Sequence, residues 1–244
     1  MYAMGAGRSD QSVKSGFVLH TYPFKETSLL IEVFTQEAGR MGLVARGARR
    51  PKSALRGLLM PFQPLLLSWG GKSELKMLHG AEWQGGIPQL QGLSLMCGFY
   101  LNELLLKFLA REDPHPMLYD VYRSAVADLS TPIDPSVTLR KFEKRLLDEL
   151  GYALTLDRDA RTGRSIDARR RYTYIVERGP VEIEDASRVD IEVSGKALLD
   201  LSENRYDDPV TLVQIKSLMR HLVNHHLGNQ ELYTRQFLRE LQQL

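Results

Sequence analysis

The sequence predicts an α+β protein in which a small five-stranded β-barrel is followed by a mainly α-helical domain. Three observations support this class. Five short apolar or alternating runs, separated by turn residues, occupy residues 13–84. From residue 85 to residue 244 the apolar residues mostly take helical spacing. A less regular, arginine-rich insertion with a possible hairpin interrupts the helices at about 155–190, and the polar residues 1–12 read as a flexible tail.

The expected strands share a length and a composition that suit a small barrel. Glycines at Gly39 and at Gly70-Gly71 supply turns between them. The expected ranges are Ser15–Tyr22, Leu29–Thr35, Met41–Arg46, Pro64–Trp69 and Glu74–Ala81. Periodicity alone fits an OB barrel and an SH3-like barrel equally well, because both use five short strands.

Helices are expected wherever apolar residues recur every three or four positions, with Pro and Gly between the segments. The expected helices are Leu93–Arg111, Met117–Leu129, Val137–Leu150, Gly195–Leu201, Val210–Leu227 and Glu231–Leu244. Inside the insertion, Tyr172–Val176 and Val181–Ile183 are expected to form a short hairpin.

Composition narrows the class of protein. The chain has 244 residues, a formal net charge of +2 and one cysteine, Cys97. A single cysteine excludes an internal disulfide and a cysteine-based zinc cage, and it suits a reducing cytosol. We find no export signal and no run long and apolar enough to span a bilayer, so the expected location is the cytoplasm, without a membrane partner.

None of the catalytic or metal-binding patterns considered is complete in this sequence. Gly71-Lys72-Ser73 resembles the end of a phosphate-binding loop, but Leu66 occupies the position where that loop needs glycine. His221 and His225 share a helix face without a third ligand, so a core or surface role is favoured over a metal site. No nucleophile elbow is present. We therefore expect no enzyme activity, no cofactor and no bound metal.

The strongest charge asymmetry lies between Arg40 and Arg56, where the chain carries six cations and no acid. Guanidinium and ammonium groups bind phosphates and release the counterions condensed on a nucleic acid. A cationic cluster can also be a merely solubilising loop. Its position after the third strand of a barrel favours the nucleic-acid interpretation. A second group at Arg158–Arg171 is diluted by acids, and a DNA groove and an internally paired loop are both left open. The candidate DNA-binding residues are Arg40, Arg46, Arg49, Arg50, Lys52, Arg56, Lys72, Lys76, Arg169, Arg170 and Arg171.

Aromatic residues of the barrel divide into two groups. Phe34, Phe62 and Trp69 are expected in the core, whereas Tyr22 and Phe24, expected in a turn, are the candidates for stacking on bases.

Several motifs resemble the RecO family of recombination mediators. They include Val18-Leu19-His20, Glu26-Thr27-Ser28-Leu29-Leu30, Leu43-Val44-Ala45-Arg46-Gly47-Ala48-Arg49 and Pro61-Phe62-Gln63-Pro64 in the first domain. Gly98-Phe99-Tyr100-Leu101-Asn102-Glu103-Leu104, Leu139-Arg140-Lys141-Phe142-Glu143 and Leu150-Gly151-Tyr152 continue the likeness. It covers nearly the whole chain from Gly16, and only the segment after Leu154 matches loosely.

The resemblance implies an OB-fold barrel and a role in DNA repair. It implies binding to single- and double-stranded DNA, strand annealing and, with RecR, help in loading RecA onto DNA coated by single-strand-binding protein. Many family members hold zinc on four cysteines, but this chain has Asp157 and Ala160 where cysteines would lie, so zinc is not expected.

The family also docks the acidic, aromatic-ended C-terminal tail of single-strand-binding protein. Such a tail needs an apolar slot beside cations. The candidates are Tyr100, Leu104, Arg140, Lys141 and Phe142, and a core role for Phe142 is the competing interpretation. For the whole chain, the alternative is an interaction scaffold whose barrel binds a peptide or a subunit instead of DNA.

Overall fold

The computed structural model describes residues 13–132, 134–184, 189–228 and 230–241, and the side chains up to Phe237. Contacts divide the chain into two compact units, one ending at Ser130 and the other beginning at Thr131. The predicted tail, 1–12, lies outside the described residues.

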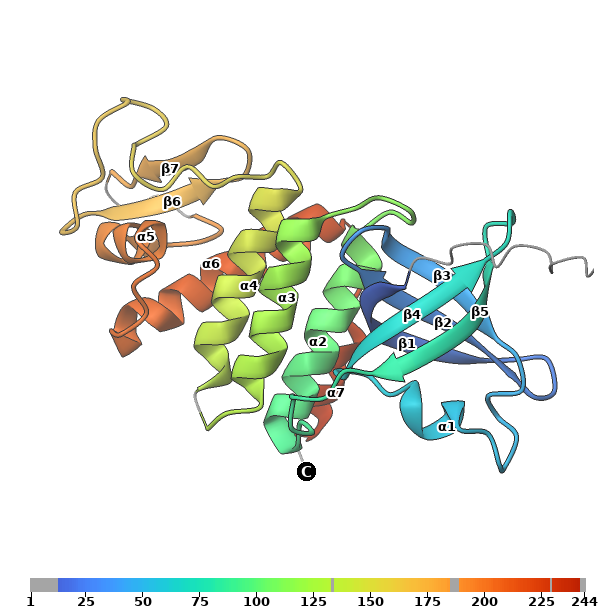
Figure 1. The fold of residues 1–244 in the computed structure, drawn as a ribbon. Helices are drawn as coiled ribbons and strands as arrows, with labels where there is room; N and C mark the ends of the chain where they lie inside the picture. Colours follow the sequence, from blue (N-terminus) through green and yellow to red (C-terminus); the bar gives the residue numbers. More distant parts are fainter. Residues whose placement is uncertain (1–12, 133, 185–188, 229, 242–244) are drawn as a thin grey trace, which may run out of the picture. The chain divides into compact units, whose positions relative to one another are not determined.

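The first unit is built on a closed five-stranded barrel (Figure 1). Its strands are β1 (Lys14–Phe24), β2 (Ser28–Thr35), β3 (Gly39–Ala45), β4 (Pro64–Gly70) and β5 (Lys76–Trp83). Neighbours follow the order β1-β2-β3-β5-β4, and β4 pairs back onto β1. The pairing of β3 with β5 is parallel, with Leu43 opposite Lys76. This strand order, with its parallel pairing of β3 and β5, identifies the OB fold and excludes the SH3-like alternative.

Alternation along the strands fills the barrel interior. Val18, Ile31, Val33, Leu43 and Leu67 are wholly buried in one hydrophobic cluster. A short helix that the sequence did not predict, α1 (Leu55–Leu58), packs against β5 and contributes Leu55 and Leu58 to this cluster. The helix therefore lies at one end of the barrel, below β4 and β5 in Figure 1.

The opposite faces of β1 and β2 are also buried, because two helices cover them. Phe17 and Phe34 pack their rings against Tyr119 and Tyr122 of α3 (Pro116–Leu129). Asn102 of α2 (Gly92–Phe108) donates a 2.9 Å hydrogen bond to the Leu19 carbonyl. The change from strands to helices occurs where the sequence predicts it, but these contacts place both helices in the compact unit of the barrel.

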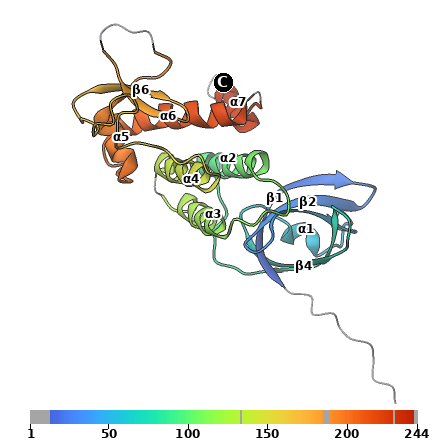
Figure 2. The same ribbon diagram turned by 90° about the horizontal axis from the view of Figure 1, so that it is seen from above.

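The second unit consists of helices and a small sheet. Its helices are α4 (Pro135–Glu149), α5 (Gly195–Ser202), α6 (Pro209–Leu227) and α7 (Tyr233–Leu241). Three strands form the sheet β7-β6-β8: β6 (Arg171–Ile175), β7 (Gly179–Glu182) and β8 (Val193–Ser194). Figure 2 shows this sheet and α5 beside the N-terminal half of α6, where Ser194 donates to Gln214 at 2.7 Å.

Asp-Pro pairs explain where two of these helices begin. Asp134 accepts a hydrogen bond from the Ser136 amide at 2.9 Å, and Asp208 accepts one from the Val210 amide at 2.9 Å. In each case proline follows as the first helical residue, where its missing N–H costs nothing. The expected helix Glu231–Leu244 begins two residues later, and residues 242–244 lie outside the described part of the chain.

The predicted strands and helices otherwise agree with the structure to within a few residues. One correction concerns Tyr22 and Phe24, which belong to the end of β1 and pair with Leu30 and Ser28 instead of lying in a turn. Phe34 and Phe62 are buried as predicted, and Trp69 is partly buried against the barrel core. Within the residues described here, no helix combines the length and the apolar character needed to cross a membrane.

Candidate nucleic-acid interface

The loop that leaves β3 is ordered by its own backbone and by one buried residue. Ala48 is wholly buried in the barrel core, and the Arg49 amide donates to the Thr27 carbonyl at 2.9 Å. The Arg49 guanidinium also reaches the Lys25 and Glu26 carbonyls at 3.4 and 3.3 Å. Gly47 adopts a left-handed φ of 67°, which allows the tight turn into the loop. The loop after β3 is thus held against the β1–β2 turn.

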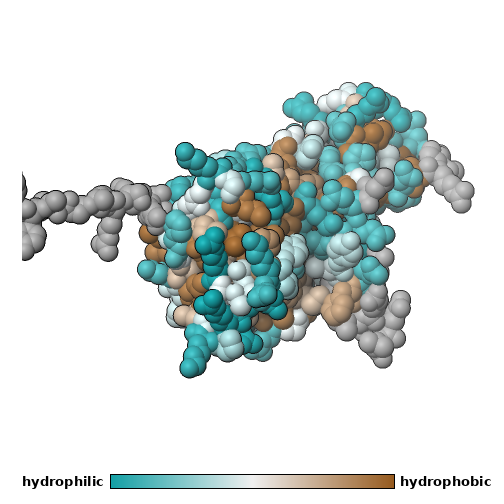
Figure 3. All heavy atoms as spheres, turned by 90° about the vertical axis from the view of Figure 1, so that its right-hand side faces the viewer, coloured by the Kyte–Doolittle hydropathy of each residue, from teal (hydrophilic) through white to brown (hydrophobic). Residues whose placement is uncertain are grey.

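This loop carries most of the predicted DNA-binding cations on its outer surface. Glu37 and Glu74 are the nearest acids in the sequence on either side of it. In the part of the chain that the structure describes, none of the exposed cations of this region forms an ion pair with a carboxylate. They are Arg46, Arg49, Arg50, Lys52 and Arg56, which we call the loop cations. Figure 3 shows the barrel side of the molecule, where hydrophilic side chains surround smaller hydrophobic areas.

Lys72 and Lys76 have different surroundings. Lys72 is exposed in the turn between β4 and β5 and has no acidic partner among the described residues. The Lys76 ammonium lies 2.9 Å from the Glu112 carboxylate and is largely covered. Lys72 therefore remains available to an anion, whereas Lys76 is engaged within the protein.

Arg40 differs from the other predicted DNA-binding cations, because its side chain is engaged within the protein. Its guanidinium lies 3.4 Å from the Glu32 carboxylate and donates to the Leu106 carbonyl. Arg111 also donates to Glu32, whose side chain is only 5% exposed, and it lies 2.5 Å from Glu74. We call Glu32, Arg40, Arg111 and Glu74 the ion network. Arg40 belongs to this network instead of the predicted phosphate-binding set.

Two glycines of β3 have close neighbours. A Cβ at Gly39 would lie 1.9 Å from the Asp113 carbonyl oxygen, and one at Gly42 would lie 2.9 Å from the Leu75 side chain. The segment around Arg111 can therefore run along β3, where the Glu112 amide donates to the Arg40 carbonyl at 2.9 Å. The OB surface on strands 2 and 3 that commonly meets nucleic acid is partly occupied by this segment.

Tyr22 borders an open depression of about 370 Å³ beside the ion network. Its ring is 44% exposed and lies 4.3 Å from the His20 ring, centroid to centroid. At the end of β1, the Lys25 ammonium lies 5.5 Å from the centroid of the Phe24 ring. Tyr22 and Phe24 thus flank the β1–β2 turn to which the loop cations are anchored.

The second basic group is mostly paired with its own acids. Arg170 is bonded to Glu182, and Arg171 lies 3.2 Å from Glu192. Arg158 and Arg161 lie 3.7 and 3.4 Å from Asp157 and Glu184. Arg164 and Arg169 are exposed, and their guanidinium groups form no ion pair among the described residues, although the Arg169 amide donates to the Asp167 carboxylate at 2.9 Å. The internally paired interpretation of this segment describes most of its arginines.

A buried carboxylate organises the same segment. Asp159, 5% exposed, accepts hydrogen bonds from the Arg161 and Thr162 amides, the Thr162 hydroxyl and the Glu182 amide, at 2.7–2.9 Å. Burial raises the pKa of the Asp159 carboxyl, but these hydrogen bonds outweigh it, and the net pKa lies below 3.8. One acidic side chain therefore joins the loop before β6 to strand β7.

Metal ligands are not gathered in the described residues. No group of three or more His, Cys, Asp or Glu side chains there is placed to hold an ion. Cys97 is buried in α2, and a chain with one cysteine does not fit a four-cysteine zinc site. His226 stacks on Tyr152 with ring centroids 4.0 Å apart, and burial lowers its pKa.

The residues predicted for a partner tail belong to two units. Tyr100 and Leu104 are buried in the first unit, at 4% and 0% exposure. Phe142 is wholly buried in the second, and the adjacent Arg140 donates to Glu143 at 2.6 Å. Phe142 therefore has the core role that was its competing interpretation. Lys141 alone of this set is exposed, with its ammonium 5.8 Å from the Tyr206 ring centroid.

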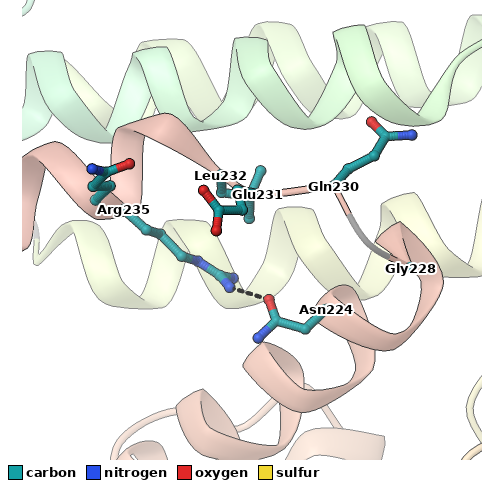
Figure 4. A pocket seen from close by; sticks show the side chains of 7 residues that line it. Asn224, Gly228, Gln230, Glu231, Leu232 and Arg235 are labelled. Carbon is teal, nitrogen blue, oxygen red and sulfur yellow. Dashed lines mark hydrogen bonds between the residues drawn. The ribbon is translucent and has the colours of Figure 1, made fainter.

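A hollow of about 440 Å³ lies between the end of α6 and α7. Figure 4 shows the side chains that line it. Arg235 crosses it to donate to Asn224 at 2.6 Å. Its other lining residues are Gly228, Gln230, Glu231, Leu232 and Gln236. The hollow is mainly polar, and none of the predicted site residues lines it.

Sequence reasoning did not single out Lys25, Arg111 or Trp83. Arg111 is separated from Glu32 by 79 positions, so no local pattern reports their contact. Trp83 ends β5 with 60% of its surface exposed, and a strand-end tryptophan carries the same sequence signature as a core residue.

Comparisons with known proteins agree across the chain. The family model described as "Recombination protein O N terminal" matches residues 10–86, and "Recombination protein O C terminal" matches residues 89–236. DNA repair protein RecO of Nitrosospira multiformis is 54% identical over 242 residues, 99% of this chain and 100% of that protein. The RecO proteins of Thiobacillus denitrificans and Aromatoleum aromaticum are 54% and 49% identical, over 95% and 97% of this chain and 93% and 98% of their own lengths. The barrel, the helical region and these matches together show that the chain belongs to the RecO family of DNA repair proteins.

Proposed function

We propose that this protein is a recombination mediator that binds single- and double-stranded DNA through the loop cations. In this role it anneals complementary strands and, with RecR, helps to load RecA onto DNA coated by single-strand-binding protein. The proposed work is strand handling in the cytoplasm, at the nucleoid, and it uses no nucleotide, cofactor or bond-making step.

One observation carries the DNA-binding part of the proposal. Five cations stand on an ordered loop that is fixed to the barrel by Ala48 and by the Arg49–Thr27 hydrogen bond. An ordered cationic surface binds phosphates without first paying the entropy of folding a flexible segment. Among the described residues no carboxylate forms an ion pair with these side chains, which leaves their charge available to phosphates.

The chemistry of the loop favours contacts to the sugar-phosphate backbone. Guanidinium groups fork onto phosphate oxygens whatever the base, so such binding tolerates any sequence. Lys72 and the aromatic residues Tyr22 and Phe24 lie on the same barrel and would add a further phosphate contact and stacking.

Docking of the acidic tail of single-strand-binding protein is a separate part of the proposal. Lys141 and Arg145 are exposed one helical turn apart on α4. Their charges support a contact with carboxylates. This surface replaces the predicted slot around Phe142, because that ring is fully buried.

The test removes four loop cations together: Arg46, Arg50, Lys52 and Arg56 become Ala, and Arg49 is kept because it anchors the loop. We expect weaker binding to every oligonucleotide sequence, and a slope of log K against log salt that is smaller by about 3 for a single strand. A matched variant with Arg158, Arg161, Arg170 and Arg171 changed to Ala loses the same charge from internally paired positions.

Fluorescence polarisation at several salt concentrations measures both variants. The loop variant is expected to lose affinity and slope, and the matched variant to keep the wild-type slope. Unchanged affinity and slope in the loop variant would contradict the proposal. Absence of DNA binding by the wild type would instead favour the scaffold alternative.

A further inference from the structure

Trp83 is the most exposed aromatic side chain of the barrel. It ends β5, where it pairs with Leu65, and 60% of its surface is exposed. By contrast Trp69, the other tryptophan of the chain, packs against the barrel core. A single exposed aromatic residue is common on protein surfaces, but an indole whose ring stands in water is available to a flat ligand ring.

The polar edge of the indole is hydrogen-bonded within the protein. Its Nε1–H donates to the Gln63 side-chain oxygen at 3.0 Å, and the Gln63 amide donates in turn to the Ile87 carbonyl at 3.2 Å. These bonds engage the polar edge of the ring. The flat surface, which carries the capacity to stack, is not used by any hydrogen bond.

One loop cation lies on the helix that packs against the strand of this ring. Arg56 belongs to α1, and α1 packs against β5, the strand that ends in Trp83 (Figure 1). Glu82 is the acid next to Trp83, and strand alternation directs it to the opposite side of the sheet. A polyanion bound at Arg56 therefore lies on the helix that adjoins the strand carrying this exposed aromatic ring.

From this arrangement we propose that Trp83 is a stacking platform for a base of single-stranded DNA. The inference rests on the proposed function and adds a contact to it that only an unpaired strand can make. A base within a duplex is already stacked on both faces, whereas an unpaired base can place one face on the indole. Trp83 thus gives the barrel a preference for single strands that the loop cations alone do not supply.

The experiment compares two probes with and without bases. One is an oligothymidylate of about 16 nucleotides, near the upper end of the site size of an OB fold. The other is an abasic sugar-phosphate strand of the same length. We expect Trp83→Ala to weaken oligothymidylate binding at least about fivefold, and to leave binding of the abasic strand unchanged. Trp83→Phe, which keeps an aromatic face, is expected to lose less.

Fluorescence gives an independent readout, because the chain has two tryptophans. In the Trp69→Phe variant, emission comes from Trp83 alone. We expect oligothymidylate to quench it and the abasic strand, bound at saturation, to leave it unchanged. Circular dichroism checks that each variant is folded.

The possible failures are distinct. If wild-type protein binds both probes and Trp83→Ala binds oligothymidylate equally tightly, the stacking inference is overturned while DNA binding stands. If the wild type binds neither probe, the proposed function itself fails.

Discussion

The guanidinium of Arg111 donates a hydrogen bond to the carboxylate of Glu32 on the outer surface of the barrel. Glu32 is almost completely buried there, and Arg40 lies on its other side. A buried carboxylate is stable only while its cationic partners remain, so the network ties the segment after α2 to strands β2 and β3.

Replacing Arg111 by Ala should therefore destabilise the barrel. We expect a loss of about 3 kcal/mol in the free energy of unfolding, since the change leaves the Glu32 charge with one partner fewer. Urea unfolding followed by circular dichroism measures it. A second change, Glu32→Gln, should recover part of the loss because it removes the buried charge, and no recovery would mean that Arg111 acts by packing alone.

Arg40 and Arg50 should respond in opposite ways to replacement by Ala. Arg50→Ala is expected to reduce the salt slope of single-strand binding by about 0.7 and to change stability by less than about 0.5 kcal/mol. Arg40→Ala is expected to lower stability and keep the salt slope, because its guanidinium bonds to Glu32 and Leu106. Each variant is the control for the other. Equal changes in the salt slope would contradict the assignment of Arg50 to phosphate binding and of Arg40 to the ion network.

Asp159 offers a graded test of the arginine-rich segment. Asp159→Ala removes all four hydrogen bonds and should cost at least about 3 kcal/mol locally. Asp159→Asn keeps an oxygen for Arg161 and Thr162 but presents an NH₂ group to the Glu182 amide, so its loss should be smaller. Hydrogen exchange of amides in β6 and β7 reports both, and wild-type protection in the Ala variant would refute this role.

The loss of stability at acidic pH should depend in part on the Asp159 carboxyl. The pKa of Asp159 in the folded protein lies below its ordinary value of 3.8. Its contribution to stability is therefore complete above 3.8 and is lost as the pH falls through the folded pKa. Urea unfolding between about pH 5 and pH 3 should show a shallower decline for Asp159→Asn than for the wild type. Parallel declines would place the acid sensitivity elsewhere.

Removal of metal should leave the second unit intact. The insertion in this unit is held together by the hydrogen bonds of Asp159 and by arginine–carboxylate pairs, which form without a metal ion. We expect the melting temperature to be unchanged by a chelator and by added zinc, measured by differential scanning fluorimetry. A fall of several degrees after chelation, reversed by zinc, would show a metal that these side chains do not explain.

The sequence predicts the strands, the helices and the family well, because each depends on local patterns. Asp134-Pro135 and Asp208-Pro209 mark helix starts directly. What it cannot predict depends on contacts between distant residues. Arg40 and Arg50 lie in the same basic stretch of the sequence, yet of these two only Arg40 forms an ion pair with Glu32. Periodicity alone fits two kinds of barrel, and the OB fold that the family resemblance implies is confirmed by the parallel pairing of Leu43 with Lys76.

Closure of the barrel has a consequence for how partners can be recognised. Strand β4 pairs back onto β1, and the parallel seam between β3 and β5 is joined at Leu43–Lys76 and Val44–Met77. Beyond that seam, the backbone of Arg40 already pairs with Arg111. A peptide or a second barrel therefore finds little uncovered strand edge to extend, and recognition by the barrel rests mainly on its side chains.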